Sequence, residues 1–152
     1  MKTKDFTENT VLHYAVTCGL EDASDMCEIL LRNGVDIDAK DSDGQNTALH
    51  LAVKDANECS EEIIQIILDY GANTELKNEY TMTPFEYATV KGNSKAVRVF
   101  VENGLCSLQT RQIERYNVNY SALEIALEIY KQHNLKKSHN VIKTMLYAMS
   151  KN

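Results

Sequence analysis

The sequence predicts an all-α solenoid built from four copies of a two-helix unit. A six-residue motif recurs at intervals of 37, 36 and 38 residues, beginning at Thr10, Thr47, Thr83 and Ser121. A second, more apolar motif follows it and ends in glycine in three copies, at Gly34, Gly71 and Gly104. One such unit cannot bury its apolar face alone, so stacked units bury each other's faces.

The first motif of each copy has the apolar spacing of a helix. In "TVLHYA" the side chains of Leu12 and Ala15 lie three residues apart, and Val16 lies four residues after Leu12. This spacing places them in one helical stripe, and it recurs in "TALHLA", "TPFEYA" and "SALEIA". Pro84 falls in the first turn of its predicted helix, where a missing N–H costs nothing.

The second motif predicts a second helix with an apolar triplet in three copies, at 29–31, 66–68 and 99–101. The glycine that follows each triplet suits a left-handed turn at a helix end, because glycine has no Cβ. In the fourth copy, 141–149, Met149 replaces the glycine and Thr144 replaces an apolar residue. Polar substitutions of this kind suit a terminal repeat whose outer face meets water.

Length and composition indicate one ordinary globular domain over 1–152, with repeats at about 5–40, 41–76, 77–114 and 115–152. Apolar residues make up 43% and charged residues 25% of the chain. No window approaches the roughly 18 consecutive apolar residues of a membrane span. The first ten residues contain no apolar core of a secretory signal. We therefore expect no membrane association and an intracellular location, in cytoplasm or nucleus.

The four cysteines have spacings that match no zinc pattern, so we expect free thiols at Cys18, Cys27, Cys59 and Cys106. Charge is unevenly spread, because residues 1–80 carry 17 acidic and 6 basic side chains, whereas residues 81–152 carry 5 and 10. Such a chain orients a charged partner as it approaches, or simply has a lopsided surface. The acidic half would repel phosphates, so nucleic-acid binding is not expected.

The motif "TALHLA", the paired helices and the segment "YGANTELKN" resemble the ankyrin repeat. The resemblance extends from Asp5 to Met149, and it weakens where Glu86 and Glu124 replace the motif histidine. It implies β-hairpin-like fingers between the repeats. It also implies that the motif threonine and histidine hydrogen-bond within the loop and helix start and to the adjoining repeat, as Thr10 with His13 and Thr47 with His50.

A histidine within an apolar run can also be a catalytic base or a metal ligand. No nucleophile or second base recurs with His50, and the remaining histidines, His133 and His139, are expected in a solvated loop. The acidic segment 36–44 lacks the bidentate Glu that a calcium loop has at its twelfth position. We therefore predict no catalytic residues, no metal site, no cofactor and no enzyme activity.

Ankyrin proteins usually bind through finger tips and the inner face of the first helices, and the resemblance carries this surface over by position. The inner-helix positions differ between copies while the apolar stripe does not, which a binding face and neutral surface drift explain equally. The expected tip residues are Ser42, Asp43, Gln45, Asn46, Asn78, Glu79, Tyr80, Met82, Asn117 and Asn119, and the expected inner-helix residues include Lys54, Asp55 and Lys91.

The third finger, 108–120, is about five residues longer than the second. It carries arginine and tyrosine side chains of the kind enriched at interface hot spots, at Arg111, Arg115, Tyr116 and Tyr120. The extra residues either bind a partner or cover the weaker fourth repeat. The turns within repeats one, two and four are also lengthened, and they are either tolerated surface insertions or functional surfaces.

The sequence thus predicts a non-catalytic protein-interaction module that binds a protein partner and is itself a monomer. A narrower alternative is a small stand-alone inhibitor or effector, similar to viral relatives of inhibitor-of-NF-kappa-B proteins, that masks a host factor. The chain could equally be a fragment of a larger ankyrin scaffold. No residue of the sequence selects the partner.

Overall fold

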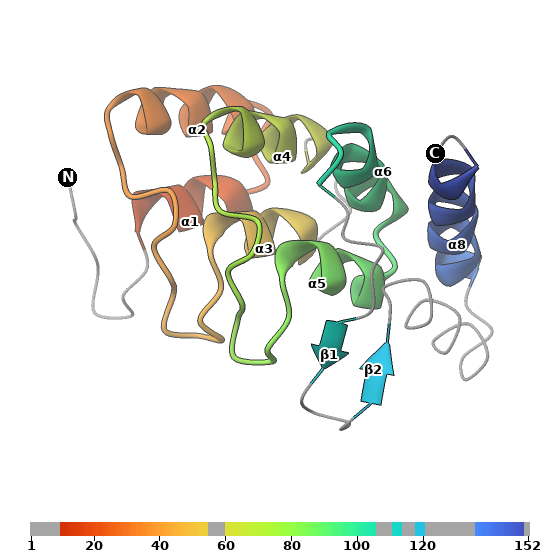
Figure 1. The fold of residues 1–152 in the computed structure, drawn as a ribbon. Coiled ribbons are helices and arrows are strands. Elements are labelled where there is room, and N and C mark those ends of the chain that lie inside the picture. Colours follow the sequence, from red (N-terminus) through yellow and green to blue (C-terminus); the bar gives the residue numbers. More distant parts are fainter. Residues whose placement is uncertain (1–9, 55–59, 106–110, 114–117, 121–135, 151–152) are drawn as a thin grey trace.

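Two rows of short helices lie side by side in a computed structural model of the chain, which describes residues 10–54, 60–105, 111–113, 118–120 and 136–150. One row holds α1 (Val11–Thr17), α3 (Ala48–Lys54) and α5 (Pro84–Lys91). The other row holds α2 (Ala23–Arg32), α4 (Ser60–Asp69), α6 (Ser94–Glu102) and α8 (Lys136–Met149). Neighbours along each row are in contact, and α1, α3 and α5 each pack on the next helix of the chain (Figure 1). The predicted all-α solenoid is confirmed.

The helices of the first row begin as their sequence predicts. At α5, the Thr83 hydroxyl accepts the backbone N–H of Glu86 at 3.3 Å, and Pro84 occupies the first turn. The glycines that follow α2, α4 and α6 have φ angles of 74°, 82° and 67°. These are left-handed conformations, which glycine adopts without the penalty that a Cβ imposes.

The core lies between the two rows and extends along the whole stack. Leu12, Leu49 and Phe85 enter it from the first row, and Ile64 and Phe100 enter it from the second. The rings of Phe85 and Phe100 meet edge to face with centroids 5.8 Å apart, a favoured geometry for aromatic pairs. Helix α8 continues this core past α6, with Val141 and Met145 completely buried.

The segment between the third and fourth units forms a short β-hairpin below the helices (Figure 1). Its strands are β1 (Arg111–Ile113) and β2 (Val118–Tyr120), which pair antiparallel. Arg111 stands opposite Tyr120, and Ile113 stands opposite Val118. The fingers expected from the resemblance therefore include one with regular strand pairing.

Two expectations about side chains and turns differ from the structure. Helix α8 begins at Lys136, five residues before the predicted 141, and so takes in part of the basic turn. His139 is therefore an exposed helical residue rather than a loop residue. Ile29 belongs to a predicted apolar triplet, yet its side chain is 59% exposed. The expected first helix of the fourth copy, near 121–127, and His133 lie outside the described residues.

Candidate protein-binding surface

The imidazole of His50 links the start of α3 to the next finger. The ring nitrogen Nδ1 accepts the backbone N–H of Thr47 at 3.2 Å and lies 2.9 Å from the Thr47 hydroxyl. With Nδ1 accepting, Nε2 carries the proton and donates to the carbonyl of Met82 at 3.0 Å. The predicted link to the adjoining repeat is confirmed.

His50 is fully buried, and this burial is the main reason that its pKa is lowered to about 4. The imidazole is therefore neutral near pH 7. Both of its nitrogens are used in structural hydrogen bonds, which leaves neither available to accept a substrate proton.

The same arrangement occurs one repeat earlier and changes one repeat later. In α1, Nδ1 of His13 accepts the N–H of Thr10 at 3.0 Å, and Nε2 meets the carbonyl of Asn46 at 3.2 Å. In α5, the carboxylate of Glu86 accepts the N–H of Thr83 at 2.8 Å. A carboxylate keeps the local cap but, when ionised, has no proton to donate to the following finger.

A buried polar network fixes the first two fingers to each other. The Asp41 carboxylate accepts the N–H of Asn46 at 2.7 Å, and the Asn78 amide donates to the Asn46 side chain at 3.1 Å. The backbone N–H of Glu79 donates to the carbonyl of Gly44 at 2.8 Å. The fingers are therefore held as one unit rather than as independent loops.

The structure corrects the placement of three expected tip residues. Asn46 and Asn78 are 7% and 5% exposed, and their amides serve the network between the fingers. The Asn78 side chain also accepts the N–H groups of Tyr80 and Met82, at 3.0 Å and 3.2 Å. Met82 is half-buried and packs against the core. Asparagine is common in turns because its side chain hydrogen-bonds nearby backbone groups. Its presence in a finger therefore did not show whether the side chain is exposed at the tip or used in such a contact.

The remaining described tip residues are on the surface. Ser42, Asp43, Gln45, Glu79 and Tyr80 are exposed. On the inner helices, Lys54 and Lys91 are the last residues of α3 and α5 and are also exposed. The Lys91 ammonium lies 5.2 Å from the centroid of the Tyr87 ring, a cation–π distance.

The other predicted binding residues are less fully placed. The backbones of Arg111 and Tyr120 are register partners in the strand pair. Asn119 lies in β2. Asp55, Arg115, Tyr116 and Asn117 lie outside the described residues.

Each of the first two fingers contains a left-handed residue that sequence reasoning missed. Gln45 and Thr81 have φ angles of 53° and 58°, and both lie two residues before the motif threonine. A β-branched residue in this conformation is a genuine outlier. Within the described part of the chain, the Thr81 hydroxyl is buried without a hydrogen-bond partner. No residue type in the sequence marks both left-handed positions. Gly44 stands one residue before Gln45 in the first finger, but no glycine stands near Thr81 in the second. The two positions share only their place, two residues before the motif threonine.

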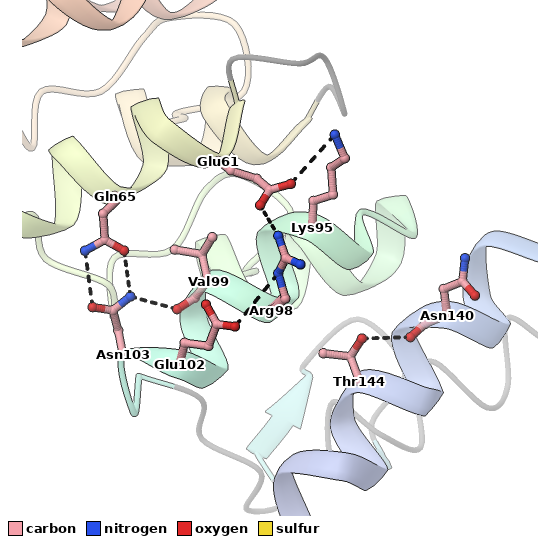
Figure 2. Close-up of polar contacts among 9 residues, drawn as sticks. All are labelled: Glu61, Gln65, Lys95, Arg98, Val99, Glu102, Asn103, Asn140 and Thr144. Carbon is pink, nitrogen blue, oxygen red and sulfur yellow. Dashed lines mark hydrogen bonds and ion pairs between the residues drawn. The ribbon is translucent and has the colours of Figure 1, made fainter.

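Polar contacts also join α4 and α6, which belong to the second row of helices, away from the finger tips (Figure 2). Glu61 on α4 pairs with Lys95 at 3.7 Å and with Arg98, both on α6. The side chains of Gln65 on α4 and Asn103, which caps the C-terminal end of α6, exchange hydrogen bonds of 2.9 Å and 3.3 Å. These exposed contacts join neighbouring repeats and give this face a structural role.

The described ranges hold no group of side chains typical of a metal site. No cluster of three or more histidine, cysteine or acidic side chains that could hold a metal ion occurs there. Of the two cysteines described, Cys18 is exposed and Cys27 is buried, and both are free thiols. None of the helices described is long and apolar enough to cross a membrane.

Comparison with known proteins agrees with the geometry of the repeats. A family model for ankyrin repeats in three copies matches residues 12–112, about two thirds of the chain. A comparison with curated proteins gives no match. The match covers the three units whose helices, histidine links and fingers are described above, and it ends within β1. The chain belongs to the ankyrin repeat family.

Proposed function

We propose that this chain binds a protein partner across its finger tips and the inner-helix face beside them. Ankyrin repeats are generally protein–protein interaction modules, and the family is typically non-enzymatic. The observation that supports this most is the contrast between the fixed fingers and their exposed side chains. The fingers are tied together through Asn46, Asn78 and the Gly44 carbonyl, while Asp43, Glu79 and Tyr80 remain exposed. A rigid support with varied surface side chains binds at a low entropic cost.

The chemistry of this surface suggests the chemistry of the partner. Asp43 and Glu79 place carboxylates at the tips, beside the aromatic ring of Tyr80. Lys54 and Lys91 place ammonium groups at the ends of the inner helices. A partner that offers basic side chains to the tips, acidic side chains to the inner helices and an apolar pocket to Tyr80 would complement both rows. The third finger, with Arg111, would lengthen the surface.

Two tyrosines of nearly equal exposure allow a direct test. Tyr80 is at a finger tip and 40% exposed, whereas Tyr70 follows α4 on the other side of the stack and is 39% exposed. A photo-crosslinking amino acid placed at either position samples the surroundings equally well. A specific partner should be captured from position 80 and not from position 70. Equal capture from both positions, or capture from 70 alone, would rule out the proposed surface.

Once a partner is in hand, charge reversal measures the contribution of the tips. We expect Glu79→Lys to weaken binding about tenfold, because a like charge then faces the partner's basic side chains. Glu102→Lys is the matched control, since Glu102 is an exposed glutamate on α6, away from the fingers. An unchanged dissociation constant for Glu79→Lys would exclude a contribution of the tip charge.

A further inference from the structure

The first repeat exposes an apolar surface at the N-terminal end of the stack. This surface, here called the N-terminal end face, consists of Val11 on α1 with Met26 and Ile29 on α2, which are 42%, 40% and 59% exposed. Helices α1 and α2 form the first pair of the stack in Figure 1. Exposed side chains of this size grouped at one end commonly mark a contact surface.

The same three repeat positions are covered in the next two repeats. The residues equivalent to Val11, Met26 and Ile29 in repeats two and three are all buried or half-buried. They are Ala48, Ile63 and Ile66 in repeat two, and Pro84, Ala96 and Val99 in repeat three. Repeats two and three each pack on a preceding repeat, through α1 with α3, α2 with α4, α3 with α5 and α4 with α6. The N-terminal end face therefore has the composition of an internal repeat interface, which suits the side of another repeat.

The other end of the described stack, at α8, presents the side of a repeat whose charge is opposite to that of the first repeat. Helix α8 packs on α6 and buries Val141 and Met145, while Leu146 remains 52% exposed and Lys143 is exposed beside it. Its 14 residues contain three lysines and no acidic residue.

By contrast, α1, α2 and the turn between them hold four acidic side chains and one arginine. That arginine, Arg32, pairs with Glu28 at 2.6 Å, so the other charged side chains of this described stretch are the exposed Glu21, Asp22 and Asp25, all of them acidic. A symmetric contact between two N-terminal end faces would set acid against acid. Contact with α8 sets acid against base.

We propose that the N-terminal end face binds α8 of a second copy of this chain, so that copies stack head to tail and continue the solenoid. The contact uses the ends of the stack and leaves the fingers and the inner-helix face open. It is therefore independent of the proposed partner-binding function. The monomer expected from the sequence is then the state at low concentration.

The first experiment measures mass by analytical ultracentrifugation of the full chain from about 10 µM to about 500 µM. At about 50 mM salt the weight-average mass should rise at least about twofold across this range, and the rise should shrink at about 500 mM salt because the end charges are screened. A mass of 17.2 kDa at every concentration and at both salt levels would overturn the proposal.

Variants then determine which ends meet. Ile29→Glu and Leu146→Glu alter exposed side chains, so circular dichroism should remain that of the parent chain. Each variant alone should stay monomeric, and an equimolar mixture should form dimers and nothing larger, because each chain keeps one intact end. Tyr80→Glu, the finger-tip control, should associate like the parent chain. If Leu146→Glu still associates alone, or if the mixture stays monomeric, head-to-tail stacking is excluded.

Discussion

At the residue scale, the protonation of His50 ties stability to pH. The pKa of His50 falls from 6.5 to about 4 on folding, so the unfolded chain takes up the proton first as pH falls. The stabilisation is complete above pH 6.5 and is lost progressively toward pH 4, by about 3 kcal/mol in total. Urea unfolding at pH 7.5, 6.0 and 5.0 should show a falling free energy of unfolding.

A variant isolates the part that His50 contributes to this pH dependence. His50→Gln keeps an acceptor and a donor but does not titrate, so its free energy of unfolding should fall less steeply between pH 6.5 and 5. That window lies above the ordinary range of carboxylates, whose titration would confuse the comparison at lower pH. Equal slopes for the two proteins would show that His50 keeps an ordinary pKa when folded.

Thr81 is predicted to be a point of stored strain. Its φ of 58° is unfavourable for a β-branched side chain, and its buried hydroxyl has no partner within the described residues. Thr81→Gly should raise the free energy of unfolding by about 1 kcal/mol, because relief of the left-handed strain exceeds the entropic cost of glycine. Thermal unfolding measures the gain. Thr74→Gly, at a position with negative φ, is the control and should not stabilise. A loss of stability in Thr81→Gly would show that the strain is absent.

At the element scale, the third junction of the stack differs from the first two. His13 and His50 each reach a carbonyl of the following finger, whereas within the described residues the Glu86 carboxylate contacts Thr83 at the start of its own helix. The residue that corresponds to Asn46 and Met82 in the following finger is Tyr120, at the end of β2. The third junction therefore lacks the donor that the first two junctions use.

Glu86→His should restore this donor. By analogy with the earlier repeats, its Nδ1 should accept the Thr83 N–H, and its Nε2–H should donate to the carbonyl at the equivalent position, Tyr120. We expect hydrogen exchange of the α8 amides to slow about fivefold, which corresponds to about 1 kcal/mol for one added hydrogen bond. The reverse change, His50→Glu, should speed exchange in the second finger. Unchanged exchange in α8 after Glu86→His would show that α8 is held independently of this junction.

At the scale of the whole molecule, the repeat pattern made most of the fold predictable. The period of the motif located α1 to α6, and Gly34 and Gly71 marked helix ends, because each feature depends on local spacing and backbone geometry. The roles of His13 and His50 were also predictable, since the family resemblance implied a hydrogen bond to the adjoining repeat, although the partner carbonyls of Asn46 and Met82 came from the structure.

The features that could not be predicted from the sequence depend mostly on contacts between residues far apart in the chain. The burial of Asn78 follows from an amide partner 32 residues earlier, which no local pattern announces. Ile29 is exposed because it lies in the first described repeat. The equivalent residue of the third repeat, Val99, is buried. Helix α8 begins early, at Lys136, and the two lysines at its start are good helix formers, whereas the polarity of "KKSH" predicts a turn. Which exposed tip residues bind remains a prediction, since exposure alone does not select among them.

The uneven junctions also predict how the whole stack unfolds. A repeat protein unfolds as a chain of neighbour-coupled units, so its weakest junction separates first. The chain has no tryptophan, and the exposed side chains of Tyr14 in repeat one and Tyr147 in α8 can each be replaced by one as a local probe. In urea, the Tyr147→Trp fluorescence should change at a lower concentration than the Tyr14→Trp fluorescence, because α8 lies beyond the junction at Glu86. Adding Glu86→His to both proteins should bring the two midpoints together. Coincident midpoints without that change would mean that contact between α6 and α8 alone couples the last helix fully to the stack.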